Sequence, residues 1–161
     1  DGCAATMLSG ETAIGDHPVE AVSVMSEIIT EAEQSHFDDI RVGAVLRAGL
    51  QHDPSWGAVG ALLAEQKEIG AILVPAAHAQ EIGTLARFRP EVPVAVGCPD
   101  ARAARQMNLF WGVVPVGAPA RDRVFVSAAR KELLRRKLVK KGARALLVQS
   151  DGAGAVKEFT L

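Results

Sequence analysis

The sequence has 161 residues, of which 48% are hydrophobic and 23% charged, an ordinary composition for a globular domain. This composition excludes disordered, collagen-like and disulfide-stapled classes, and no apolar run approaches the ~18 residues that a membrane span needs. No secretory signal pattern is present. We therefore expect a cytoplasmic protein. The chain opens Asp1-Gly2-Cys3 without a Met, in the middle of what the sequence indicates is a strand, so we also expect it to be a piece of a longer protein.

Charge is distributed unevenly along the chain. Residues 1–38 contain eight Asp and Glu and no Lys or Arg, whereas residues 39–161 contain eleven acidic and all eighteen basic side chains. An abrupt shift of this kind is typical of a domain boundary. We predict two parts, residues 1–38 and residues 39–161.

The first part predicts one strand–loop–helix unit. Residues 3–8 form a short apolar run that indicates a buried strand. A helix is expected to begin at Pro18, with Asp16 or His17 as its cap, because proline suits the first helical position. One helix face carries the apolar residues Ala21, Val22, Met25, Ile28, Ile29 and Ala32. This unit cannot bury that face alone and needs a sheet from outside the chain.

From residue 39 onward, apolar strands and helices alternate. Strands are predicted at 71–74, 93–96, 112–116, 143–148 and 156–161, and helices at 53–68, 78–88, 100–110 and 121–138. Asp100 is expected to be the N-cap of the third of these helices. Continuous apolar strands separated by helices indicate parallel pairing with both sheet faces covered. The predicted fold class is α/β, a five-stranded, mostly parallel sheet with helices on both faces and its last strand at an edge.

Four ordered sequence blocks carry a resemblance to a known family. They read MLSGETAIGDHPVEAV at 7–22, RFRP at 87–90, ARQ followed by WGVVPV between 104 and 116, and LVKKG at 138–142. In this order they resemble pyruvate kinase. The resemblance implies that residues 1–38 are the last strand, loop and helix of the (β/α)8 catalytic barrel. Residues 39–161 would be the C-terminal α/β domain, which in this family carries effector binding and subunit contacts.

The resemblance also implies chemistry that lies outside this chain. Pyruvate kinase transfers a phosphoryl group from phosphoenolpyruvate to ADP, and the groups that hold Mg²⁺ and K⁺ belong to earlier barrel strands. We therefore expect no catalytic residue here and an inactive isolated chain. The implied partners are the protein's own N-terminal barrel portion and further copies in a homo-oligomer, usually a tetramer; no membrane partner is expected.

Three residues of the first loop are weak candidates for the nucleotide side of the active site, namely Ser9, Glu11 and Thr12. The alternative is structural, because a carboxylate near a helix start is favoured by the helix dipole and satisfies free N–H groups. We favour the structural role.

The loop after the first strand of the second part decides the expectation about activation. In sugar-phosphate-activated relatives it is rich in Ser, Thr and Gly, whereas the matching positions here are Ala76, Ala77, His78, Ala79, Gln80 and Glu81. No hydroxyl remains, and a carboxylate at close range opposes a phosphate by about 1 kcal/mol or more. We predict that fructose bisphosphate does not activate this protein in the usual way. A surface or capping role is favoured for His78 over contact with another anion.

The remaining candidates are weaker. Effector-crevice positions after other strands are Arg121, Arg123, Ser150, Gly152 and Gly154, for which solvated side chains and a tight turn are the simpler interpretations. A basic run comprises Arg130, Lys131, Arg135, Arg136, Lys137, Lys140 and Lys141. Without interleaved aromatic residues it indicates a solvated helix end rather than a nucleic-acid site. The four histidines and two cysteines lack zinc-site spacing, so no metal is assigned.

Two other functions stay open. The second part could act alone as a small-molecule or anion sensor, since such scaffolds host many functions. It could also serve only to hold an oligomer together. Residues 1–36 argue against the sensor, because a self-sufficient sensor needs no barrel strand and helix.

Overall fold

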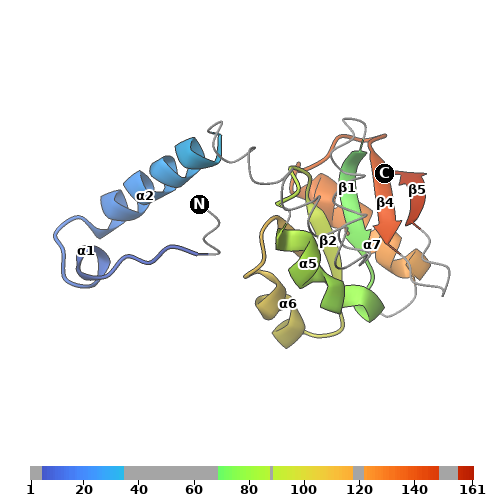
Figure 1. Ribbon diagram of the computed structural model, residues 1–161, viewed down its shortest axis with the longest axis horizontal. Coiled ribbons are helices and arrows are strands. Elements are labelled where there is room, and N and C mark those ends of the chain that lie inside the picture. Colours follow the sequence, from blue (N-terminus) through green and yellow to red (C-terminus); the bar gives the residue numbers. More distant parts are fainter. Residues whose placement is uncertain (1–4, 35–68, 88, 118–121, 149–155) are drawn as a thin grey trace, which may run out of the picture. The chain divides into compact units, whose positions relative to one another are not determined.

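The computed structural model describes residues 5–34, 69–87, 89–117, 122–148 and 156–161 (Figure 1). The chain divides into two compact units, Asp1–Val45 and Leu46–Leu161. The predicted boundary at residue 38 and the predicted helix at 53–68 lie outside the described residues and stay predictions.

The first unit contains two helices, α1 (Gly10–Ala13) and α2 (Pro18–Glu33). The predicted start of α2 is confirmed, since Pro18 is its first residue, although His17 occupies the capping position without a side-chain hydrogen bond. No residue of α2 is buried, and Ile28 on its apolar face is 59% exposed. The helix therefore forms with its apolar stripe turned to solvent.

The strand predicted at residues 3–8 is wrong in its described portion. Residues 5–9 form no regular secondary structure, and the Met7 side chain is 86% exposed. Backbone N–H and C=O groups of a strand must pair with a neighbouring strand. Among the described residues, all sheet pairing involves the second unit, so this apolar run has nothing to pair with.

The second unit is built on a five-stranded sheet, as predicted. Its strands are β1 (Ile69–Val74), β2 (Val94–Cys98), β3 (Val113–Gly117), β4 (Arg144–Val148) and β5 (Val156–Thr160). Their order is β3-β2-β1-β4-β5, parallel except for the β4–β5 pair. Only seven residues join β4 to β5, too few for the crossover that a parallel pair requires, so β5 runs antiparallel at the edge.

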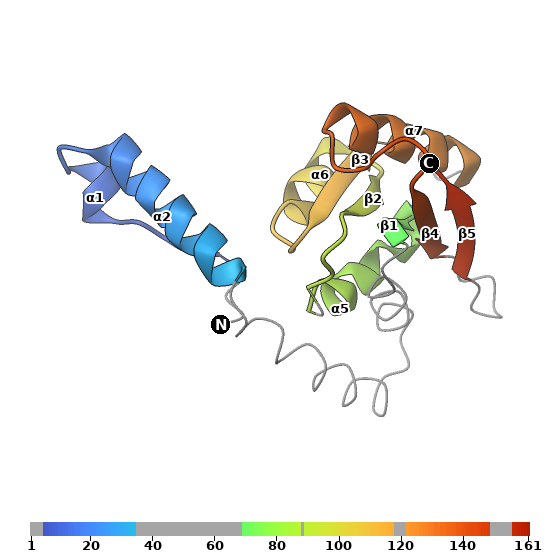
Figure 2. The same ribbon diagram turned by 90° about the horizontal axis from the view of Figure 1, so that it is seen from above.

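Both faces of the three inner strands, β1, β2 and β4, are buried. On one face Leu73, Ala95 and Leu147 form a core with Phe125 and Leu133 of α7 (Asp122–Arg135). Alternate strand residues point to the other face. There α5 (Ile82–Arg87) lies on the side opposite α7, with Ile82 and Leu85 fully buried (Figure 2). The sandwich of helix, sheet and helix matches the predicted fold class.

Three helix boundaries differ from the prediction for local reasons. The helix expected at 78–88 begins earlier as the 3₁₀ helix η1 (Ala76–Glu81) and continues as α5. The next, α6 (Ala101–Met107), is capped as expected by Asp100, which accepts a 2.8 Å hydrogen bond from the Ala103 N–H. The last helix ends at Arg135 because Lys137 has a φ of 59° and Leu138 N–H donates to Leu133 O.

Candidate functional site

The sheet topology identifies where a ligand would bind. The chain moves from β1 outward to β2 and β3, then returns across β1 to β4. Ligands of open α/β sheets bind beyond the carboxyl ends of the strands, where this reversal occurs. Here the reversal lies between β1 and β4, so the segments that follow these two strands are the candidate site.

The segment after β1 is η1, and it consists of the six positions predicted to be degenerate. Pro75 precedes it with extended backbone, and its carbonyl accepts a 2.9 Å hydrogen bond from His78 N–H. Ala76, Ala77 and Ala79 place only methyl groups on this helix, and His78 is half-buried. Gln80 and Glu81 belong to η1 by their backbones, but their side chains lie outside the described part of the chain. The described side chains of η1 offer no hydroxyl to a phosphate.

Close packing of η1 on β2 depends on a residue that the sequence interpretation did not single out. A Cβ atom on Gly97 would lie 2.7 Å from Ala76 N and 3.3 Å from the Phe125 ring. Distances this short are not tolerated, so only glycine lets the backbone of η1 approach β2 this closely. In the sequence, a glycine inside an otherwise apolar strand was the signal that could have indicated this close backbone approach.

The end of β2 offers two groups with chemistry, and both are engaged. Cys98 is buried, its thiol donates a weak 3.5 Å hydrogen bond to Val96 O, and burial raises the pKa of that thiol. A raised pKa keeps the sulfur protonated and unreactive. Asp100 uses its carboxylate to cap α6. Neither group is positioned to bind a ligand.

The other crevice candidates are only partly described. Arg123 lies in the first turn of α7 and is exposed. Arg121, Ser150, Gly152 and Gly154 lie outside the described residues, so their predicted roles stay predictions.

The three candidates of the first unit lie together at α1. Ser9 N–H donates to Glu11 Oε2 at 3.0 Å, and Thr12 Oγ1 donates to Ser9 O at 3.3 Å. Hydrogen bonds from backbone N–H groups lower the pKa of Glu11. These contacts are local, and both the nucleotide-side role and the structural role of the three residues stay predictions. Beside them an open hollow of about 520 Å³ is lined mainly by apolar side chains of α2, among them Met25 and Ile28.

Two of the recognised sequence blocks meet in space. The Arg89 guanidinium lies over the Trp111 ring, 4.6 Å from its centroid, which is cation–π geometry. Arg89 has a φ of 44° and Gly112 a φ of 63°, and Gly112 O accepts a 2.9 Å hydrogen bond from Val94 N–H. The RFRP and WGVVPV blocks therefore form one structural contact ahead of β2 and β3.

Two general features hold for the part of the chain that is described. Across its ranges no group of three or more His, Cys, Asp or Glu side chains is arranged to hold a metal ion. None of the described helices is long and apolar enough to span a membrane.

Comparison with known proteins identifies the family. The family model for the pyruvate kinase alpha/beta domain matches residues 59–159. The chain belongs to the pyruvate kinase family. It is 34% identical over 128 residues to a pyruvate kinase of Chlamydia pneumoniae, covering 76% of this chain and 26% of that protein. It is 33% identical over 116 residues to pyruvate kinase 2 of Synechocystis sp., covering 72% of this chain and 19% of that protein.

A solved pyruvate kinase shares the fold. The crystal structure of the Cryptosporidium parvum enzyme superposes with a TM-score of 0.80 over 96% of this chain and 32% of that chain, at 21% identity. This pyruvate kinase family member thus spans between a fifth and about a quarter of the length of the curated relatives named above.

Proposed function

We propose that this chain is the C-terminal part of a pyruvate kinase that converts phosphoenolpyruvate and ADP to pyruvate and ATP in glycolysis. The carrying observation is the family match over residues 59–159, which coincides with the sheet and its covering helices. In this proposal the second unit serves regulation and subunit assembly, and the chemistry belongs to the rest of the enzyme.

The first unit fits the proposed place at the end of the catalytic barrel. Its apolar run at residues 5–8 has no strand partner among the described residues, and α2 exposes Val22 and Ile28. In a complete (β/α)8 barrel, neighbouring strands and helices would cover both features. In the isolated chain, the α2 amides should therefore exchange rapidly with solvent. In the parent enzyme they should be protected, whereas unchanged exchange would contradict this placement.

Phosphoryl transfer depends on positioning and on cations that neutralise developing charge. The parent would hold Mg²⁺ and K⁺ on earlier barrel strands, so the 161-residue chain should produce no pyruvate. A coupled assay with phosphoenolpyruvate, ADP, Mg²⁺ and K⁺ tests this, with the full-length parent as the active control. Turnover by the purified chain would contradict the assignment of chemistry to the rest of the enzyme.

Regulation by fructose bisphosphate is proposed to be absent in its usual form. The support is η1, whose described positions carry alanine methyl groups and His78 in place of hydroxyls. Calorimetric titration of fructose 1,6-bisphosphate into the chain should give no saturable heat at millimolar ligand. In the parent, the phosphoenolpyruvate concentration for half-maximal rate should not move when the sugar phosphate is added. Saturable binding would overturn this part of the proposal.

Assembly of the parent is proposed to be a homotetramer to which the second unit contributes. The strand β5 pairs with β4 and forms an edge of the described sheet, and exposed edges favour pairing with another chain. Sedimentation velocity of the parent should give a tetramer mass, and a monomer at micromolar concentration would contradict it.

A further inference from the structure

The outer side of α7 is a cationic surface that the proposed function does not use. The helix buries Phe125, Ala129 and Leu133 in the core, so its opposite side turns to solvent. Residues 130–141 contain seven Lys and Arg but one acidic residue, Glu132. This composition leaves a strong local excess of positive charge at the end of α7.

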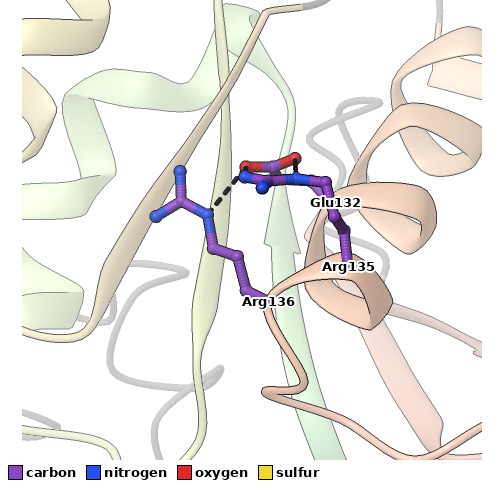
Figure 3. A network of polar contacts seen from close by, with 3 residues as sticks. All are labelled: Glu132, Arg135 and Arg136. Carbon is purple, nitrogen blue, oxygen red and sulfur yellow. Dashed lines mark hydrogen bonds and ion pairs between the residues drawn. The ribbon is translucent and has the colours of Figure 1, made fainter.

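The carboxylate of Glu132 already pairs with two arginines. Arg135 donates to both Glu132 oxygens at 2.7 and 2.8 Å, and Arg136 Nε donates to Oε1 at 2.7 Å (Figure 3). These two guanidinium groups lower the pKa of Glu132 to about 2, so it remains ionised at neutral pH. Within the described ranges, no carboxylate lies at ion-pair distance from Arg130, Lys131 or the lysines after the helix. The surface therefore keeps its excess charge after all these contacts are made.

Large apolar side chains accompany the charges. Val124 is 46% exposed, and Lys131 and Arg135 follow it by seven and eleven residues, which places the three on one helix face. Leu138, 45% exposed, comes directly after the turn at Lys137 that ends the helix. Arginine is enriched at protein–protein contact surfaces, and Val124 and Leu138 add apolar area beside the arginines here. Arg130 is exposed on the adjoining side of the helix, one residue before Lys131. We call Val124, Lys131, Arg135 and Leu138, together with Arg130, the α7 surface.

The aromatic content of this region distinguishes between two kinds of acidic partner. Single-stranded nucleic acids are bound by stacking bases on aromatic side chains beside a cationic groove. Between residues 122 and 144 the one aromatic residue is Phe125, which is buried in the core. An acidic protein segment needs no stacking and offers apolar side chains to Val124 and Leu138.

We propose that the α7 surface binds an acidic amphipathic segment of a protein. Its carboxylates pair with Arg130 and Lys131, and its apolar residues pack on Val124 and Leu138. This is the mode in which an amphipathic helix docks through regularly spaced apolar anchors, with complementary charge supplying specificity. The interaction is separate from the proposed catalytic and assembly roles and does not depend on them.

The test uses the 161-residue chain and a labelled helical peptide of Glu, Leu and Ala about as long as α7. Fluorescence anisotropy compares this peptide with the same pattern carrying Lys for Glu, with polyglutamate, and with polyuridine RNA. The acidic amphipathic peptide should bind most tightly, and its affinity should fall as salt rises. Equal binding of polyglutamate, or tighter binding of the RNA at the same salt, would overturn the proposal.

Variants locate the contact. Arg130→Glu with Lys131→Glu should weaken peptide binding about tenfold, and Val124→Ser about threefold. The matched control is Arg102→Glu with Arg105→Glu, the same charge change at exposed positions of α6. Since all these side chains are exposed, circular dichroism should show unchanged folding. An equal loss of peptide affinity in the α6 control would show that binding depends only on the net charge of the protein, and it would contradict the proposal.

Discussion

The two units of the chain use apolar residues in opposite ways. In the second unit, every residue of β1 except Gly70 is buried, and Leu133 of α7 has no exposed surface. In the first unit, α2 has a comparably apolar stripe, yet no residue of it is buried. An apolar pattern therefore specifies which face of a helix or strand can be buried. Burial of that face stabilises the fold only where the chain also supplies a second layer that packs against it.

Truncating one apolar side chain in each unit should expose this contrast most strongly. Leu133→Ala should lower the free energy of unfolding of the second unit by about 3 kcal/mol, because it leaves a cavity in the core. Ile28→Ala should cost less than about 0.5 kcal/mol, because its side chain already meets water. Urea denaturation followed by circular dichroism measures both. Comparable losses would mean that α2 packs against something in the isolated chain.

A pair of glycines tests the packing of η1 within the second unit. Gly97→Ala should destabilise by about 1–3 kcal/mol, since the added Cβ meets backbone that cannot move aside. Gly117→Ala is the control, because a Cβ added there, at the end of β3, would meet nothing within 4 Å. Thermal unfolding of both variants measures the two changes in stability. A neutral Gly97→Ala would show that η1 shifts freely from β2.

Acid should remove a smaller contribution at the end of α7. The Glu132 pKa is lowered from 4.5 to about 2, so its ion pairs stabilise the fold above pH 4.5 and are lost as the pH falls toward 2. Glu132→Gln should therefore cost about 0.5–1 kcal/mol at pH 7 and almost nothing at pH 2. Denaturant titrations at both pH values measure the difference. Glu27→Gln on exposed α2 is the control and should leave the second unit unchanged at either pH.

The smallest expected effect is a gain. Lys137 has a φ of 59°, a left-handed backbone conformation that glycine adopts without strain and other residues adopt at a cost. Lys137→Gly should therefore stabilise the second unit by about 0.5 kcal/mol. Lys140→Gly, at a position without positive φ, should give no gain. Thermal unfolding of the two variants measures both effects. Equal effects would contradict the assignment of backbone strain to Lys137.

Local signals in the sequence correctly predicted most of the second unit and the start of the long helix in the first unit. Apolar runs identified all five strands, Asp100 was correctly expected as a cap, and Pro18 marked the start of α2. These features depend on a few neighbouring residues and on the periodicity of burial, which a sequence displays directly. The assignment of residues 76–81 to the effector loop, made by counting back from Pro90, stays a prediction, and the structure shows that these residues form η1.

Features that join distant residues were not predictable in the same way. The contact of Arg89 with Trp111 and the approach of Ala76 to Gly97 each join segments about 20 residues apart. The strand predicted at residues 3–8 shows the same dependence, because its described residues 5–8 form no strand in the absence of a neighbouring strand among the described residues.

By itself, the sequence determined the family, the alternation of strands and helices, and the absence of hydroxyl side chains from the loop after β1. Composition and short motifs suffice for these, because each is a property of neighbouring residues. Only the tertiary structure decided that this loop becomes the 3₁₀ helix η1 in close contact with Gly97, and that the outer face of α7 combines exposed cations with Val124. Each of these depends on how separate segments share space, and steric contact and burial are settled only when the segments pack.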